Sequence, residues 1–118
     1  MPFEIRLQST DPARPNEELL RQILERQGDL ADFLKEEDPS VEDAKVAPQA
    51  GFPTGLEPFV ISVVVAFATG FAVGVVKGAG GEIGKQVGAE LGKRIGVRIR
   101  LWIQKEFPDV AVKEVSEK

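Results

Sequence analysis

The side chains of this sequence that could do chemistry are carboxylates, because the chain has neither cysteine nor histidine. That composition excludes thiol nucleophiles, cysteine–histidine zinc sites and histidine acid–base catalysis. Paired carboxylates occur at Glu17/Glu18, at 36–38 and at Glu42/Asp43. No base, nucleophile or metal-suited partner accompanies them, so we interpret them as solvated surface. We therefore expect no enzymatic activity, no metal site and no cofactor.

A glycine-rich stretch, Gly70 to Gly96, is the second candidate, since glycine-rich loops can cradle phosphates. The Walker pattern would start at Ala79 and end at Gln86, where it requires a glycine and a hydroxyl side chain. Residues 78–84, GAGGEIG, resemble the glycine-rich turn of short-chain dehydrogenases more closely. Glu82, however, would face the pyrophosphate, and too little chain follows to complete a nucleotide-binding fold. Nucleotide binding is therefore the least favoured interpretation.

The same glycines recur at helical spacing. At 100° per residue, eight of the nine glycines in this stretch fall within an arc of about 120°. Each glycine inside a helix costs about 0.5–1 kcal/mol relative to alanine, so a helix retains such a stripe only where close packing compensates. We predict a glycine zipper, a seam that lets another helix approach closely. The seam consists of Gly70, Gly74, Gly84, Gly88, Gly92 and Gly96.

An uncharged run, Phe59–Val76, precedes the glycine-rich helix. As a helix it would span about 27 Å, at the lower limit for crossing a bilayer. Its β-branched residues favour a strand, but the run is too long for an ordinary buried strand. We therefore expect an apolar helix. The glycine seam would lie either between subunits in or at a membrane, which we favour, or within a soluble helical hairpin.

Basic residues dominate the helix that follows the apolar run. Between Lys77 and Lys105 there are seven bases and two acids, whereas residues 1–57 hold 13 acids and six bases. Each base would cost about 2.5–3.5 kcal/mol at mid-bilayer, so this helix cannot cross lipid alone. It could lie along an anionic leaflet or line a pore. The expected lipid or pore contacts are Lys85, Lys93, Arg94, Arg98, Arg100 and Trp102.

The charge pattern also predicts partners and location. Few aromatic residues are interleaved with the bases, so nucleic acid is not an expected partner. Anionic membrane lipid and further copies of the chain are expected partners. The first residues, MPFEIRLQ, lack the apolar core of a signal peptide. We therefore expect the protein in the bacterial cytoplasm, associated with the inner membrane.

The remaining segments predict the scaffold. Apolar and polar residues alternate over 3–8, as in a half-buried strand. Apolar residues recur at helical spacing over 17–37, with Asn16 as a plausible N-cap. Short strands are expected over 41–48 and 108–115.

These elements predict an α+β fold with a small β-α-β head, a long glycine-zipper helical segment and a C-terminal strand. We expect the helical segment to be a hairpin that turns at Gly78–Gly81, because a continuous rod of about 72 Å would separate the last strand from the first two. The expected division is a head over 1–50, a glycine/proline linker over 51–58, the helical pair over 59–106 and the strand over 107–118.

One family shows a similar order of features. The corresponding segments are FEIRLQ, EELLRQIL, AKVAPQAGFPTGLEP, the Phe59–Val76 run, RIRLWIQK and DVAVKEV. This layout is similar to that of the effector-associated constant component family of bacterial conflict systems, and the similarity covers most of the chain. The long glycine-zipper helix looks like an insertion relative to that family. The resemblance implies a non-enzymatic partner of a protease, nucleotide-sensing or other effector protein in defence.

Together these patterns favour a non-enzymatic, membrane-associated and self-associating component of a bacterial defence or toxin-like system, for which a pore is one possible form. The alternative is a soluble interaction or adaptor module. In that alternative, the apolar run is buried in the protein's own core or against a partner protein.

Overall fold

The structure, a computed structural model, describes residues 1–49, 51, 53–68 and 81–118, with the backbone alone over 81–89. In chain order its elements are β1 (Pro2–Ser9), α1 (Asn16–Glu25), α2 (Gln27–Glu37), β2 (Val41–Pro48), β3 (Phe59–Phe67), α4 (Gly81–Glu106) and β4 (Val110–Glu117). The strands expected at the start of the chain, at 41–48 and near its end are confirmed, as is helical structure over 17–37.

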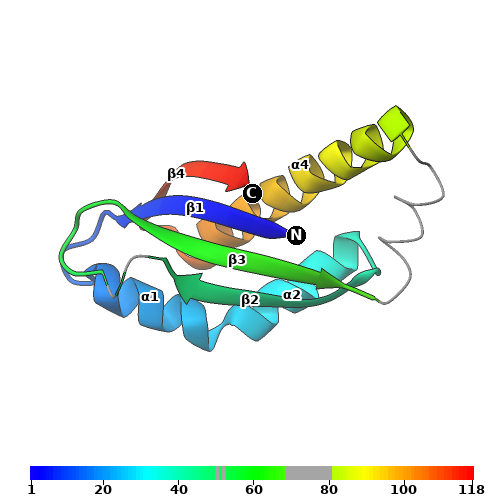
Figure 1. Ribbon diagram of the computed structural model, residues 1–118. Helices are drawn as coiled ribbons and strands as arrows, with labels where there is room; N and C mark the ends of the chain where they lie inside the picture. The colour runs from blue at the N-terminus through cyan, green and yellow to red at the C-terminus, as the bar shows by residue number, and fades with distance from the viewer. Residues whose placement is uncertain (50, 52, 69–80) are drawn as a thin grey trace.

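The strands form one antiparallel sheet in the order β2-β3-β1-β4 (Figure 1). Helices α1 and α2 connect β1 to β2, and α4 lies between β3 and β4 in the chain. Each of these two connections therefore passes over one intervening strand. This β-α-β-β-α-β arrangement is that of ferredoxin-like folds. The predicted α+β class with a C-terminal strand is confirmed, and β4 pairs with β1.

The apolar run is the main departure from the sequence prediction. Phe59–Phe67, expected to begin a helix, forms β3 and pairs with β1 on one side and β2 on the other. The predicted apolar helix is wrong over these residues, and no long helical hairpin is seen among the described ones. Residues 69–76, the rest of the run, lie outside the described residues. So does most of the expected turn at Gly78–Gly81, and α4 begins at Gly81.

Side-chain shape and burial explain why this run forms a strand. Valine and isoleucine are stiff at χ1 and pack well on a pleated sheet. Ile61, Val63 and Val65 face the helices and are at most 1% exposed, whereas Val64 is 47% exposed on the opposite face. Because β3 is central, neighbouring strands bond its backbone on both edges. The whole run is too long for an ordinary buried strand, but β3 uses only its first half.

The core lies between the sheet and the helices, which cover one of its faces (Figure 1). The helices contribute Leu19, Leu20 and Ile23 from α1, Leu30 and Leu34 from α2, and Ile95, Ile99, Trp102 and Ile103 from α4. Phe107, just after α4, meets the Trp102 ring edge to face, with ring centroids 5.8 Å apart. The guanidinium groups of Arg14 and Arg26 lie 5.4 and 5.5 Å from the Phe107 centroid. This aromatic contact closes the core at the turn into β4.

Asn16 begins α1 rather than capping it from outside, and it is fully buried. Its side-chain carbonyl accepts a hydrogen bond from the Ser9 N–H at 3.0 Å, and its side-chain amide donates to the Glu57 carbonyl. Its backbone N–H donates to the Gly55 carbonyl at 2.7 Å. Asn16 therefore holds the segment before β3 against the end of β1.

Helix α4 is the longest element of the fold. Its 26 residues measure about 39 Å at 1.5 Å per residue. Figure 1 shows its N-terminal half extending past the end of the sheet, while its C-terminal half packs on the sheet. Within the described ranges, no helix combines the length and the hydropathy that crossing a membrane requires.

We predict that shortening a buried side chain of β3 will lower the free energy of unfolding much more than shortening an exposed one. Ile61→Ala is expected to lower the free energy of unfolding by about 2–5 kcal/mol, because it opens a cavity in the core. Val64→Ala, three residues further along, is the matched control and should change it by no more than about 0.5 kcal/mol. Denaturant unfolding of both variants measures the difference. Equal small effects would contradict the register of β3.

Candidate functional site

The outer side of α4 is the most distinctive surface of the protein. Ile95, Ile99 and Trp102 face the sheet, so the opposite side of the helix faces solvent. Val97 and Leu101 lie there, one helical turn apart, and are 57% and 45% exposed. Contiguous exposed apolar patches mark surfaces that meet a partner, and this pair forms a small patch on α4.

Basic side chains surround this apolar pair. Lys93, Arg94 and Arg100 are exposed, as the prediction of lipid contact requires. The Arg100 guanidinium also donates to the Val112 carbonyl at 3.4 Å, close to the limit for a hydrogen bond. Arg98 is partly buried. Of the other two predicted contacts, the Lys85 side chain lies outside the described residues.

Trp102 was predicted to contact lipid or a pore, but its side chain is buried. It is 2% exposed and lies in the core among the apolar residues of α4. Its position on the helix is the physical reason, because Trp102 shares the side of α4 that carries Ile95 and Ile99. Contact with lipid would require the core to open, so Trp102 is not a candidate contact in this fold.

The predicted glycine seam is described only in part. Gly92 and Gly96 are buried, and both face the chain's own sheet. A Cβ added at Gly92 would collide with the Glu117 side chain of β4, and one added at Gly96 would meet Val115 and Phe3. The Glu117 carboxylate therefore packs directly on α4 at Gly92, whereas the packing at Gly96 leaves room for a Cβ. Gly84 and Gly88 continue this face in the part of α4 beyond the sheet, and Gly70 and Gly74 lie outside the described residues.

Helix α2 lies beside α4 and carries the opposite charge. Its exposed acids are Asp29, Asp32, Glu36 and Glu37. At the junction of the helices, the Arg98 guanidinium lies 4.3 Å from the centroid of the Phe33 ring, and Arg98 Nη1 lies 3.7 Å from Glu37 Oε2. Lys105 Nζ is 5.9 Å from the same ring centroid. A basic face and an acidic face therefore adjoin along the α2–α4 junction.

Two shallow grooves follow this junction. One has a volume of about 250 Å³ and is lined by Glu37, Lys93, Arg94, Val97 and Arg98. The other has a volume of about 200 Å³ and is lined mainly by residues of α2 together with Lys105 and Glu106. The first has apolar walls and charged rims, which suits a side chain of a partner better than a small polar substrate.

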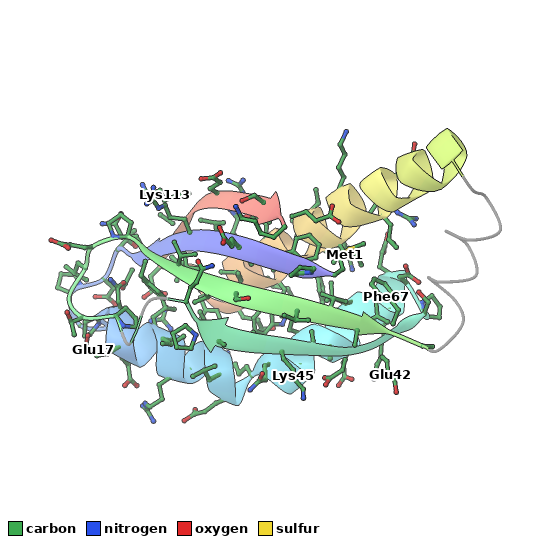
Figure 2. The ribbon with its side chains drawn as sticks, in the orientation of Figure 1. Met1, Glu17, Glu42, Lys45, Phe67 and Lys113 are labelled. Carbon is green, nitrogen blue, oxygen red and sulfur yellow. The ribbon has the colours of Figure 1, made fainter. Side chains whose placement is uncertain are left out.

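The outer face of the sheet carries both polar side chains and the exposed Val64, and no helix covers it among the described elements (Figure 1). Figure 2 labels Lys45 and Lys113, two exposed bases on β2 and β4. Glu4 accepts a hydrogen bond from the Gln49 side-chain amide at 2.6 Å and lies 3.2 Å from Lys118 Nζ. The hydrogen bond from Gln49, followed by that from Lys118, lowers the pKa of the Glu4 carboxyl. The lowered pKa follows from these two contacts on the protein surface.

The acidic side chains of the described residues are spread over helix and turn surfaces. No group of three or more acidic side chains is placed to hold a metal ion in the described ranges. The paired carboxylates at 17–18 lie on α1 and those at 36–37 on α2, Asp38 directly follows α2, and all are partly or fully exposed. Glu17 accepts from the Gly55 N–H at 3.1 Å, and Asp38 accepts from the Ser40 N–H at 3.0 Å. Their contacts are those of helix and turn surfaces.

Comparisons with known protein families, with curated proteins and with solved structures found no match to this chain. The order of its strands and helices makes this an α+β protein with a ferredoxin-like arrangement, and α2 and α4 form a charged surface on it. Its function must be argued from that surface.

Sequence reasoning missed the acidic face of α2 as part of this surface. The signal was present, because residues 27–37 hold four acids and one base, whereas 93–105 hold five bases and no acid. Only the topology, which places α2 beside α4, joins the two segments into one surface.

We predict that Gly96→Ala will stabilise the protein. The added Cβ would lie 3.5 Å from Val115 Cγ1 and 3.6 Å from Phe3 Cε1, both ordinary van der Waals contacts. Alanine favours a helix over glycine, so the free energy of unfolding should rise by about 0.5–1 kcal/mol. Gly28→Ala in α2, where the added Cβ meets open space, is the matched control and should give a similar gain. A loss of stability in Gly96→Ala alone would show that α4 lies closer to the sheet.

Proposed function

We propose that this protein is a non-enzymatic, self-associating interaction module in which α4 is the contact element. The observation that supports the proposal is the exposed pair Val97 and Leu101, set among bases on the outer side of the longest helix. Burial of this pair against a partner would remove apolar surface from water, and the surrounding charges would select the partner.

The position of the apolar run supports an interaction module over a membrane-spanning form. Ile61, Val63 and Val65 are committed to the core, where they contribute to the main hydrophobic cluster. The run is thus partly buried in the protein's own core, as in the alternative expected from the sequence. A helix that spans a bilayer from Phe59 to Val76 would require β3 to leave both of its neighbours.

The biological setting is also part of the proposal. We place the module in a bacterial defence or toxin-like system, with an effector protein as a further partner. The support for this setting is the order of features in the sequence, which resembles that of the effector-associated constant component family. Gly84 and Gly88 remain a predicted seam for a further helix, on the side of α4 opposite Val97 and Leu101.

A second candidate function is contact with an anionic membrane surface, such as the cytoplasmic leaflet of the inner membrane. Lys93, Arg94 and Arg100 are exposed beside the apolar pair, and each base near an anionic surface contributes about 1 kcal/mol. This form requires no spanning helix. Helix α2 opposes it, because its exposed acids lie next to the same surface.

We predict that the apolar pair on α4 drives self-association. The variant Val97→Gln/Leu101→Gln should weaken association by about tenfold or more, because it removes the apolar centre of the contact. Sedimentation velocity over a range of protein concentrations measures this. Val64→Gln, which changes an exposed valine on the other face of the molecule, is the matched control and should associate as the wild type does. A wild-type protein that stays monomeric at every concentration would contradict the proposed function.

We predict that any membrane contact will be superficial. With vesicles that contain anionic lipid, the protein should bind at low salt, detach at high salt and release no trapped dye, because β3 remains in the sheet. Vesicles of zwitterionic lipid alone serve as the control for charge. Dye release would support a pore and would mean that the apolar run leaves the core.

A further inference from the structure

We propose that the self-association contact is a two-fold symmetric pairing in which α2 of each copy meets α4 of the other. This inference rests on the proposed self-association and specifies its surface and geometry. The occupant of the surface is a second copy of this chain, and the contact is made by opposite charges around an apolar centre.

The charges of the two helices match in number. Helix α2 holds four acids and one base, which gives a net charge of −3. The part of α4 from Glu90 to Glu106 holds five bases and two acids, which gives +3. A surface with equal and opposite halves is complementary to a second copy of itself when a two-fold axis exchanges the halves.

The two helices run side by side in opposite directions. At one end, Arg26 beside α2 lies 3.2 Å from Glu106 of α4. At the other end, Glu37 of α2 lies 3.7 Å from Arg98 of α4. Both helices lie on the same face of the sheet, so their outer sides form one surface with an acidic half and a basic half (Figure 1).

A two-fold axis along the α2–α4 junction would pair these halves. Rotation about that axis places α4 of the second copy over α2 of the first at the same level along the helices. Arg94 and Lys105 would then lie over the acidic half formed by the second copy's α2, which includes Asp32 and Glu36. Both contacts occur twice, as in any isologous dimer.

The apolar residues lie at the centre of this arrangement. Val97 and Leu101 are exposed on α4, and Phe33 is half-buried at the junction with α2. Protein interfaces commonly have such a centre, with a polar rim around it. Here the rim would consist of the acids and bases of the two helices.

The same acids favour a second copy over a lipid surface. Asp29, Asp32 and Glu36 are exposed beside the basic face, and the second groove brings them next to Lys105. An anionic bilayer that approached the α2–α4 surface would meet these carboxylates as well as the bases. In a symmetric dimer, each carboxylate faces a base instead.

Charge reversal tests the inference in the full-length chain. Arg94→Glu/Lys105→Glu makes both halves acidic, and Asp32→Lys/Glu36→Lys makes both halves basic. Each variant alone should dimerise about tenfold or more weakly than the wild type, because like charges would then face each other. An equimolar mixture should form a heterodimer about as stable as the wild-type dimer. Sedimentation velocity with one variant carrying a fluorescent label measures both effects.

Controls and alternative outcomes separate this inference from the proposed function. Lys45→Glu/Lys113→Glu, at two strand residues that Figure 2 labels, changes the same number of bases elsewhere and should dimerise normally. Thermal unfolding of each variant verifies that it folds. A dimer unaffected by either reversal would overturn the inference and leave self-association standing. A monomeric wild type would overturn both, and a monomer whose binding to anionic vesicles is lost only in Arg94→Glu/Lys105→Glu would favour the membrane instead.

Discussion

Pairing of β3 with β1 is the interaction on which the rest of this structure depends. Ile61 lies opposite Ile5 and Val63 lies opposite Phe3, with all four side chains at most 1% exposed under the helices. Burial of an apolar side chain of this size contributes roughly 1.5–3 kcal/mol, so this pair of strands supplies much of the driving force for the core. It also places the first half of the uncharged run in the sheet, so these residues do not form part of a membrane-spanning helix.

The position of β3 determines where the helices can lie. Because β3 stands between β1 and β2, the connections through α1 and α2 and through α4 each pass over one strand, on the same face of the sheet. This brings α2 and α4 together in opposite directions, although 43 residues (38–80) separate them in the sequence. The acidic and basic faces are thus adjacent as a consequence of the topology. The surface proposed for self-association exists only in the folded chain.

Local patterns in the sequence were sufficient for much of the scaffold. The alternation of Phe3, Ile5 and Leu7 predicts β1, and the spacing of Leu19, Leu20 and Ile23 predicts the buried face of α1, as observed. The helix phase of Trp102, which matches that of Ile95 and Ile99, already placed it on the buried side. The prediction of lipid contact disregarded that phase and relied on residue type.

The rest of the fold depends on contacts between distant segments. Whether an apolar, β-branched run becomes a strand depends on partners at both of its edges, and for β3 these come from β1 and β2. The role of Gly92 and Gly96 likewise depends on β4 and β1, which approach α4 from the two ends of the sequence. Helical spacing identified a close-packing face without showing what would pack against it. The excess of acids in α2 is visible in the sequence, but a single amphipathic helix with exposed carboxylates is common on protein surfaces, so the excess alone did not indicate a contact with α4.

The most direct test of this account is the state of β3 itself, measured by nuclear Overhauser effects in isotopically labelled protein with and without anionic vesicles. The account predicts cross-strand contacts between Ile61 and Ile5 and between Val63 and Val46, and it predicts that they persist when vesicles are added. Sequential amide contacts typical of a helix over 59–67, in either condition, would contradict it.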